Sequence, residues 1–253
     1  MNKLNIIRKT KSLFLKWNLH KVVHPFSDAL SNAINMGHLS KWRKEHPVKG
    51  YNDFYQRKWD YNRRYNLYEA MGQQENLFHQ PIDYFEFGVA GGHSFRWWLK
   101  NNLHQHSRFF GFDTFEGLPE KWGSFEIGAM AVAMESLKID DPRASFYKGL
   151  FQETLIPFLS QYDGRNKRLI HLDADLFSST LFTLTQLYRC LKPGDILLFD
   201  EFAVPQHEFL AFKLFTESFY IDYEVIGAAN NYLFVAIKLM SFTGIKNKEL
   251  KNG

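Results

Sequence analysis

The sequence predicts an α/β fold: a doubly wound, mostly parallel sheet of seven strands with one antiparallel strand at its end, preceded by a helical extension. Short apolar strands alternate with amphipathic helices from residue 81 onward, which is typical of a parallel sheet covered by helices. The last two strands are separated only by residues 227–230. A parallel crossover needs a dozen or more residues, so these two strands must form a hairpin.

Three regions follow from this pattern. They are a basic helical extension at residues 1–65, the α/β domain at residues 66–240 and a polar tail at residues 241–253. The chain of 253 residues is long enough for one large domain with a sizeable core.

The extension is expected to form helices that are interrupted at His24-Pro25 and His46-Pro47, because the residue before a proline resists helix. A further helix is expected within residues 51–78. Residues 1–64 carry 14 Lys or Arg against 4 Asp or Glu, whereas the remainder carries 17 against 23. Such a basic arm fits peripheral contact with an anionic membrane or an acidic substrate. The equal alternative is a solvated arm packed on the domain or on a second subunit of a homo-oligomer.

The domain is expected to contain seven strands, at residues 81–85, 108–113, 145–148, 168–173, 195–201, 223–226 and 231–237. Helices are expected at residues 94–100, 152–161, 181–191 and 209–219. The single Cys190 lies in an apolar helical pattern, which indicates a core position and excludes an internal disulfide. No run of about 18 uncharged apolar residues is present, so no membrane span is predicted. A cytoplasmic protein is expected, with the basic arm available to the inner membrane surface. No aromatic RNA-binding motif is present, so nucleic acid is not an expected partner.

The first strand runs into a glycine turn, Gly88-Val89-Ala90-Gly91-Gly92, and then into a helix capped by His93 or Ser94. Such a turn lets a ligand lie against bare backbone at a helix N-terminus. A dinucleotide fingerprint has glycine at the position of Ala90, so the spacing disfavours NAD. A glycine turn with no ligand is the structural alternative.

Carboxylates stand at the C-terminal ends of the predicted strands, namely Glu86, Asp113, Asp173, Asp200 and Glu201. This edge of an open α/β sheet is the one that binds ligands. Carboxylates gathered there repel one another unless a cation joins them. Asp173, Asp200 and Glu201 offer the oxygen ligands that Mg²⁺ or a similar divalent cation prefers. For each acid alone, a helix cap or a solvated loop is the alternative.

The chain resembles the macrocin O-methyltransferase family over residues 60–238. The motifs that carry the resemblance lie at residues 86–92, 111–119, 148–155, 171–180 and 200–201. Members of that family have a Rossmann-like class I methyltransferase fold, use S-adenosylmethionine and methylate sugar hydroxyls. The resemblance implies a set of cofactor-binding residues: Glu86, Gly88, Val89, Gly91 and Gly92 for the methionine part, Asp113 for the ribose with Thr114 beside it, and Gly149, Leu150 and Phe151 around the adenine. It also implies that Asp173, Asp200 and Glu201 hold Mg²⁺. Glu201 stands where the family usually has Asp, and Asp195 stands where it usually has Gly.

These observations predict an S-adenosylmethionine-dependent O-methyltransferase that acts on a hydroxyl of a sugar, a sugar-containing metabolite or a glycan. Methyl transfer is an in-line displacement that needs a deprotonated, aligned acceptor oxygen. A divalent cation could chelate two neighbouring hydroxyls and lower the pKa of one. Asp173 is the predicted base, with His93 and His207 as lesser candidates. Two other functions stay open: an NAD-dependent sugar dehydrogenase and a non-catalytic glycan- or membrane-associated binding module.

Overall fold

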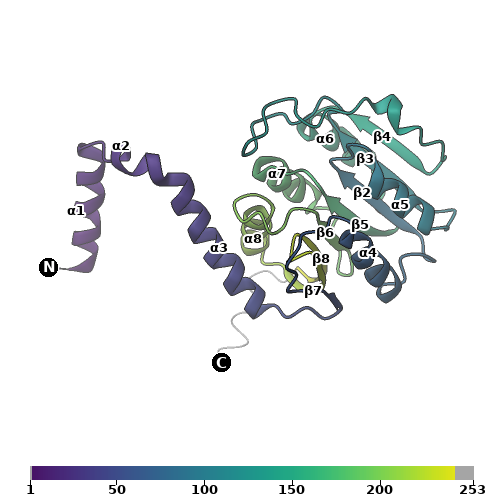
Figure 1. Cartoon of the computed structure of the whole chain (residues 1–253), viewed down its shortest axis with the longest axis horizontal. Coiled ribbons are helices and arrows are strands. Elements are labelled where there is room, and N and C mark those ends of the chain that lie inside the picture. Colours follow the sequence, from purple (N-terminus) through teal and green to yellow (C-terminus); the bar gives the residue numbers. More distant parts are fainter. Residues whose placement is uncertain (1, 243–253) are drawn as a thin grey trace.

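One mixed sheet forms the centre of the molecule. The structure, a computed structural model, describes residues 2–242, so most of the predicted tail lies outside the described residues. The strands are β1 (Tyr51–Asn52), β2 (Ile82–Phe87), β3 (Arg108–Asp113), β4 (Ala144–Lys148), β5 (Lys167–Leu172), β6 (Ile196–Phe199), β7 (Asp222–Ala229) and β8 (Phe234–Ser241). Their order across the sheet is β1-β7-β8-β6-β5-β2-β3-β4 (Figure 1).

All seven predicted strands are present, but the sheet differs from the prediction at one end. The antiparallel strand β8 lies between β6 and β7 and pairs with both, so the prediction that it ends the sheet is wrong. Its residues 234–237 are fully buried, which suits an interior strand rather than an edge. An eighth strand, β1, pairs in parallel with β7 and contributes only two residues.

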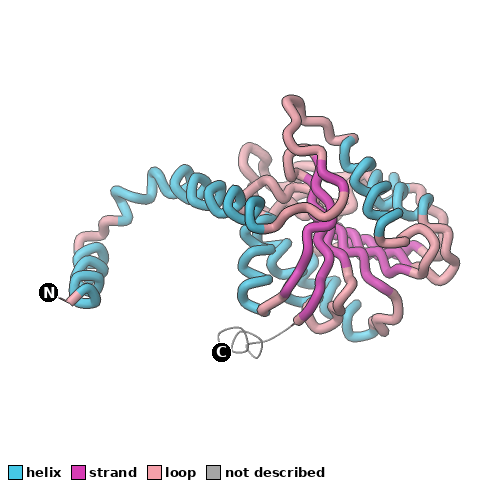
Figure 2. Tube along the Cα trace, turned by 90° about the horizontal axis from the view of Figure 1, so that it is seen from below, coloured by secondary structure: helices cyan, strands magenta, loops and turns pink. Residues whose placement is uncertain are grey.

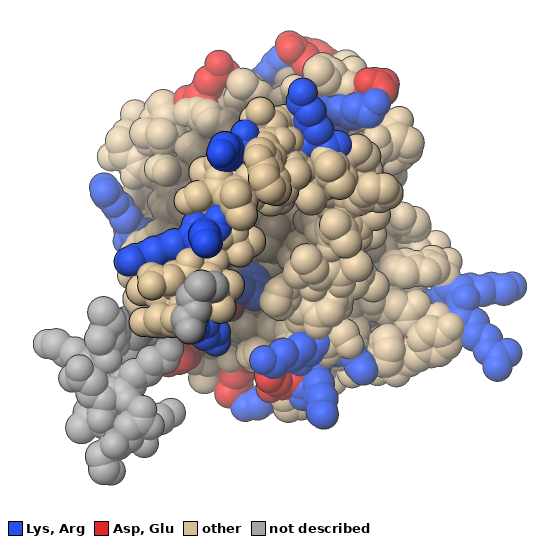
Figure 3. Space-filling view, turned by 90° about the vertical axis from the view of Figure 1, so that its left-hand side faces the viewer, with Lys and Arg blue, Asp and Glu red and all other residues tan. Residues whose placement is uncertain are grey.

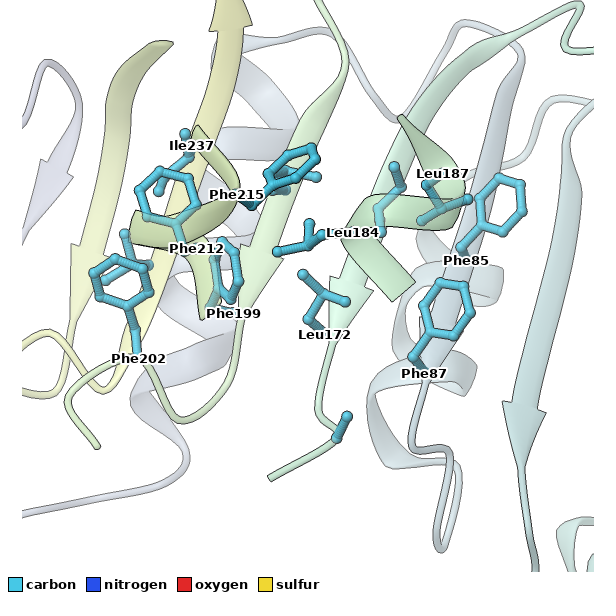
Figure 4. Close-up of a cluster of buried hydrophobic side chains, with 14 of the residues drawn as sticks. Phe85, Phe87, Leu172, Leu184, Leu187, Phe199, Phe202, Phe212, Phe215 and Ile237 are labelled. Atoms are coloured by element: carbon cyan, nitrogen blue, oxygen red, sulfur yellow. The ribbon is translucent and has the colours of Figure 1, made fainter. Parts of the chain in front are cut away.

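Helices cover both faces of the sheet (Figure 2). They are α1 (Lys3–Lys16), α2 (His20–Val23), η1 (His24–Phe26), α3 (Ser27–Glu45), α4 (Arg63–Gln74), α5 (His93–Asn101), η2 (Met134–Leu137), α6 (Phe151–Gln161), α7 (Phe177–Leu187) and α8 (Glu208–Phe219). One core cluster joins the sheet to α6, α7, α8 and the end of α3. Figure 4 shows the part of this cluster between the strands, α7 and α8. The other joins the opposite face to α4 and α5. Strand β2 serves both, since Phe85 and Phe87 point to the first cluster and Tyr84 to the second.

The helix predicted within residues 51–78 begins only at Arg63. The preceding segment is a loop because its Asn and Asp side chains bind backbone amides in tight turns. Asn52 accepts from the N–H of Phe54 at 3.0 Å, and Asp60 accepts from the N–H of Asn62 at 2.9 Å.

The N-terminal helices project from the domain (Figure 1). The predicted interruptions are confirmed: η1 contains Pro25, and α3 ends before His46. Helix α3 is anchored most firmly near its end, through the buried Trp42, and Gln206 Nε2 donates to Asp28 O in its first turn at 3.3 Å. Cys190 is partly buried and packs against the first core cluster. Over residues 2–242, no helix is both long and apolar enough to cross a bilayer.

Candidate active site

The strand order reverses between β2 and β5. From β2 the chain proceeds outward to β3 and β4, and it then returns to place β5 and β6 on the other side of β2. The crevice beyond the C-terminal strand ends at such a point is where open α/β sheets bind ligands. Backbone hydrogen bonds tie these ends together: Asp173 N–H donates to Phe87 O at 2.9 Å, and Asp200 N–H donates to Leu172 O at 3.1 Å.

The glycine turn after β2 has the backbone that the sequence predicts. Gly88 has φ +95°, and a Cβ added there would lie 1.9 Å from the carbonyl oxygen of Asp173. No side chain fits that gap, so the turn can approach β5 only as glycine. Gly92, at φ +68°, is the N-cap of α5, whereas the sequence had suggested His93 or Ser94. The cap is a left-handed residue, which glycine adopts without strain.

Asp113, at the end of β3, fastens the glycine turn to the next loop. One carboxylate oxygen accepts from the N–H of Ala90 at 2.8 Å, and the other accepts from the N–H of Phe115 at 2.7 Å. Each oxygen retains acceptor capacity for a ligand hydroxyl.

A pocket opens between this turn and β5. Six of the predicted site residues line it: Gly88, Asp113, Thr114, Leu150, Phe151 and Asp173. Further lining comes from the loop after β3 with Gly117, Leu118, Pro119 and Met130, and from Ala90, Gln152, Ala174, Asp175 and Ser179. The other seven predicted site residues do not line this pocket: they are Glu86, Val89, Gly91, Gly92, Gly149, Asp200 and Glu201.

Beside the pocket, a buried column of polar side chains crosses the sheet. Glu86 on β2 is directly opposite His171 on β5, and both are almost fully buried. Glu86 accepts a hydrogen bond from the Tyr84 hydroxyl, and His171 Nδ1 lies 3.0 Å from the same hydroxyl. His171 Nε2 lies 3.4 Å from Asp200 Oδ1. Glu86 thus faces His171 rather than the pocket, and its role with the cofactor stays a prediction.

Carboxyl groups crowd around the end of this column. Burial and the neighbouring Asp200 raise the pKa of Asp173 well above its ordinary range, and the same causes raise that of Asp175 to about 7. Burial, Asp200 and Asp175 raise the pKa of Glu201 to about 8. Burial lowers the pKa of His171, but hydrogen bonds with Asp200 and Glu86 outweigh it and raise this pKa to about 10. His171 is therefore a cation that offsets part of the negative charge.

Two of the three predicted metal ligands come together, and the third does not. Among the described residues, His171, Asp173 and Asp200 place potential ligand atoms within 4.8 Å of one another. Glu201 is outside this group. Its backbone N–H donates to Glu208 Oε2 at 2.9 Å, while the charge of Asp200 still raises the pKa of its carboxyl. The prediction that Glu201 completes the metal site stays a prediction.

Arg64, from α4, already faces the group. Its Nη1 lies 3.1 Å from Asp200 Oδ2, and the side chains of Arg64 and Asp200 are only 16% and 4% exposed. The guanidinium carbon stands 4.8 Å from the centroid of the Phe234 ring, which helps to hold it. The surplus of carboxyl oxygens fits a hard divalent cation held by Asp173 and Asp200, with Arg64 as the group it would displace.

Sequence reasoning missed the roles of His171, Arg64 and Asp175. One signal could have found the first: His171 lies two residues before Asp173 at the end of β5, a spacing that places both side chains on one side of an extended chain. Arg64 comes from a distant helix and carries no such signal. The two histidines considered from sequence have other settings: His93 is exposed at the start of α5, and His207 caps α8 with its ring 6.3 Å from that of Trp122.

Comparison with known proteins identifies the class of protein that has this fold. The solved structures of the O-methyltransferase NovP and the calicheamicin methyltransferase CalS11 share the fold. NovP has a TM-score of 0.57 and 19% identity, covering 84% of this chain and 99% of its own. CalS11 has a TM-score of 0.54 and 20% identity, covering 71% of this chain and 78% of its own. An O-methyltransferase from Bacillus cereus, in complex with SAH, has a TM-score of 0.50 and 14% identity, covering 87% and 97%. No curated protein matches the sequence.

The fold is that of the class I, Rossmann-like methyltransferases. The model of the macrocin O-methyltransferase (TylF) family matches residues 62–230, more than half of the chain. The chain belongs to this family.

Proposed function

We propose that this enzyme transfers a methyl group from S-adenosylmethionine to a hydroxyl of a sugar, a sugar-containing metabolite or a glycan. The observation that carries the proposal is one pocket whose lining joins the glycine turn and Asp113 to Asp173 and Asp175. Donor-binding backbone and proton-accepting carboxyls thus share one space. The sugar acceptor is supported by the family, which is named for an enzyme that methylates macrocin.

The cofactor is proposed to span the pocket from the glycine turn to the start of α6. Its methionine part would lie along residues 88–92, the positive end of α5. Its ribose would meet Asp113, and its adenine would lie near Leu150 and Phe151. Leu150 is 37% exposed, Phe151 is buried, and both line the pocket, which gives an apolar surface for a planar ring.

Asp175 is the base that we infer, in place of the predicted Asp173. It lines the pocket but stands outside the group of potential ligands, so it can accept a proton while Asp173 and Asp200 hold a cation. In the metal-free chain, burial and Asp200 raise its pKa to about 7, and burial alone still favours proton uptake by this carboxylate. The acceptor oxygen loses its proton to this carboxylate and takes the sulfonium methyl, which leaves a methyl ether and S-adenosylhomocysteine.

The assistance of Mg²⁺ belongs to the same proposal. Asp173 and Asp200 would hold the cation, which supplies a Lewis acid that lowers the pKa of an acceptor hydroxyl. His171, held between Glu86 and Asp200, fixes the position of the Asp200 carboxylate. The dehydrogenase and the non-catalytic module are not favoured, since the family and the fold are those of methyltransferases.

Calorimetric titration with S-adenosylmethionine, with and without Mg²⁺, tests the division of roles. Asp113→Ala should weaken cofactor binding at least about 10-fold, because a lost bond to a charged group costs about 1.5–3 kcal/mol. Asp200→Ala should spare cofactor affinity and abolish the effect of Mg²⁺. Asp175→Asn should keep both and lower kcat about 10²–10⁴-fold in a methyl-transfer assay over nucleotide sugars and glycan fragments. Equal loss of cofactor affinity in Asp113→Ala and Asp200→Ala would contradict the proposal.

A further inference from the structure

The N-terminal arm, defined here as residues 3–26, does not pack against the catalytic domain. None of the side chains in α1, α2 or η1 is buried. The domain contacts α3 from its first turn, where Gln206 Nε2 donates to Asp28 O at 3.3 Å, to the buried Trp42, whereas the arm itself stands clear of the domain (Figure 1). A free helix of 14 residues is marginal in water, which indicates that α1 acquires a partner.

One side of α1 is apolar. Five apolar residues fall on a single face at the helical spacing i, i+1, i+7, i+8 and i+11. They are Ile6, Ile7, Leu13, Phe14 and Trp17. Trp17 is 62% exposed, and the other four are between 37% and 45% exposed. Such an apolar face, left open to water, is a docking surface.

The charge of the arm selects the kind of partner. Six cations, Lys3, Arg8, Lys9, Lys11, Lys16 and Lys21, lie in it, and no Asp or Glu occurs among residues 2–27. At helical spacing Arg8 lies opposite the apolar face and Lys9 and Lys16 flank it, while the exposed Leu4 and Leu15 lie on the same side as Arg8. On the side of the molecule from which the arm projects, lysine and arginine side chains are spread widely and acidic ones lie mainly near the margins (Figure 3). The partner must therefore be anionic.

We propose that the arm lies on a membrane surface that contains anionic lipid. An apolar face, a basic opposite face and low overall hydrophobicity are the features of a helix that rests in the interface plane. Trp17, at the end of α1, is the residue type that sits at headgroup level. Pairing of two arms is a poorer alternative, because the second arm would bring the same cations and no acid to pair with them. The arm would hold the catalytic domain at the surface through α3, whatever the acceptor.

Vesicle co-sedimentation of the full chain tests this proposal. The chain should pellet with vesicles that contain phosphatidylglycerol and should stay in solution with pure phosphatidylcholine. High salt should weaken the binding, because exposed charges are screened. The double variant Lys9→Glu, Lys16→Glu should lose at least about 10-fold in binding, as each basic residue near an anionic surface is worth about 1 kcal/mol. Phe14→Ser with Trp17→Ser should lose binding even at low salt.

A matched control reverses two exposed lysines of the catalytic domain, Lys100→Glu and Lys138→Glu, and it should bind vesicles like the unaltered chain. Cofactor affinity should be unchanged in all these variants, which separates arm defects from misfolding. The proposal is overturned if the unaltered chain stays in solution with anionic vesicles, or if the control loses as much binding as the arm variant. It is also overturned if the chain ignores vesicles but sediments as a dimer that Phe14→Ser with Trp17→Ser turns into a monomer.

Discussion

At the scale of single residues, the site depends on the close approach of two backbone segments and on several buried carboxyl groups that lie near one another. Gly88 lets the turn after β2 touch the backbone of β5, and Asp113 ties that turn to the next loop. Beside them, Asp175 and Glu201 carry raised pKa values because burial and the other acids disfavour a further negative charge. Backbone shape and electrostatics at this edge can therefore be tested separately.

Replacing Gly88 by Ala should disrupt the turn. The new Cβ would lie 1.9 Å from the Asp173 carbonyl oxygen at φ +95°, so we expect a loss of about 3 kcal/mol or more in the free energy of unfolding and a marked loss of cofactor affinity. Gly194→Ala is the control, because Gly194 has φ +94° but open space around it. It should lose only about 1–2 kcal/mol and keep cofactor binding. Urea unfolding and calorimetry measure both, and equal effects of the two variants would contradict the close approach.

The acid cluster should make stability depend on pH. The pKa of Glu201 is raised from 4.5 to about 8, so the folded chain holds this proton more tightly than the unfolded chain does. The free energy of unfolding gained in this way is complete below pH 4.5 and is lost as the pH rises toward 8. Glu201→Gln cannot ionise, so its loss over this range should be smaller by on the order of 2 kcal/mol.

Urea titrations at several pH values measure that difference. Glu135→Gln, at an exposed position outside the cluster, should follow the unaltered chain. Parallel curves for Glu201→Gln and the unaltered chain would count against a crowded carboxyl at this position.

At the scale of elements, local signals predicted the domain better than the extension. Strand β2, the glycine turn and α5 follow directly from an apolar run, small residues and an amphipathic helix. The sequence could not show that β8 enters the sheet between β6 and β7, because a short connection fixes pairing but not the neighbour on the other side. It also could not separate the loop before α4 from the helix, since aromatic and basic residues suit either.

The anchor of α3 gives a prediction at this scale. Trp42 is 7% exposed, packs against Phe202, Phe209 and Phe212, and donates from Nε1 to the Tyr223 hydroxyl at 2.8 Å. Trp42→Ala should lower the free energy of unfolding by about 3–5 kcal/mol and expose α3 to protease. Trp17→Ala, at an exposed position of the arm, should change neither result. Equal protease resistance of both variants would show that α3 does not depend on Trp42.

At the scale of the whole molecule, the predicted class and α/β fold are confirmed, whereas the place of β8 in the sheet and part of the pocket lining were not predicted. Loop residues such as Leu118 and Met130 line the pocket, yet their sequence shows no periodicity that could place them. Arg64 reaches Asp200 from a helix more than 130 residues earlier, which is a tertiary contact and not a local pattern. The carboxylates at the strand ends could be assigned from the sequence. The cationic side chains that offset their charge, such as Arg64, could not.

The central claim is that the pocket beside Gly88 holds the methyl donor next to carboxylates that serve the acceptor. A crystal structure with S-adenosylhomocysteine and Mg²⁺ tests it most directly. We expect the ligand between the glycine turn and Leu150, its ribose on Asp113, and the cation on Asp173 and Asp200 with Arg64 moved aside. A ligand bound elsewhere, or a pocket left empty at saturating concentration, would contradict the account. If the ligand is bound but Arg64 still contacts Asp200 and no cation is present, the proposed donor site is supported and the proposed metal site is contradicted.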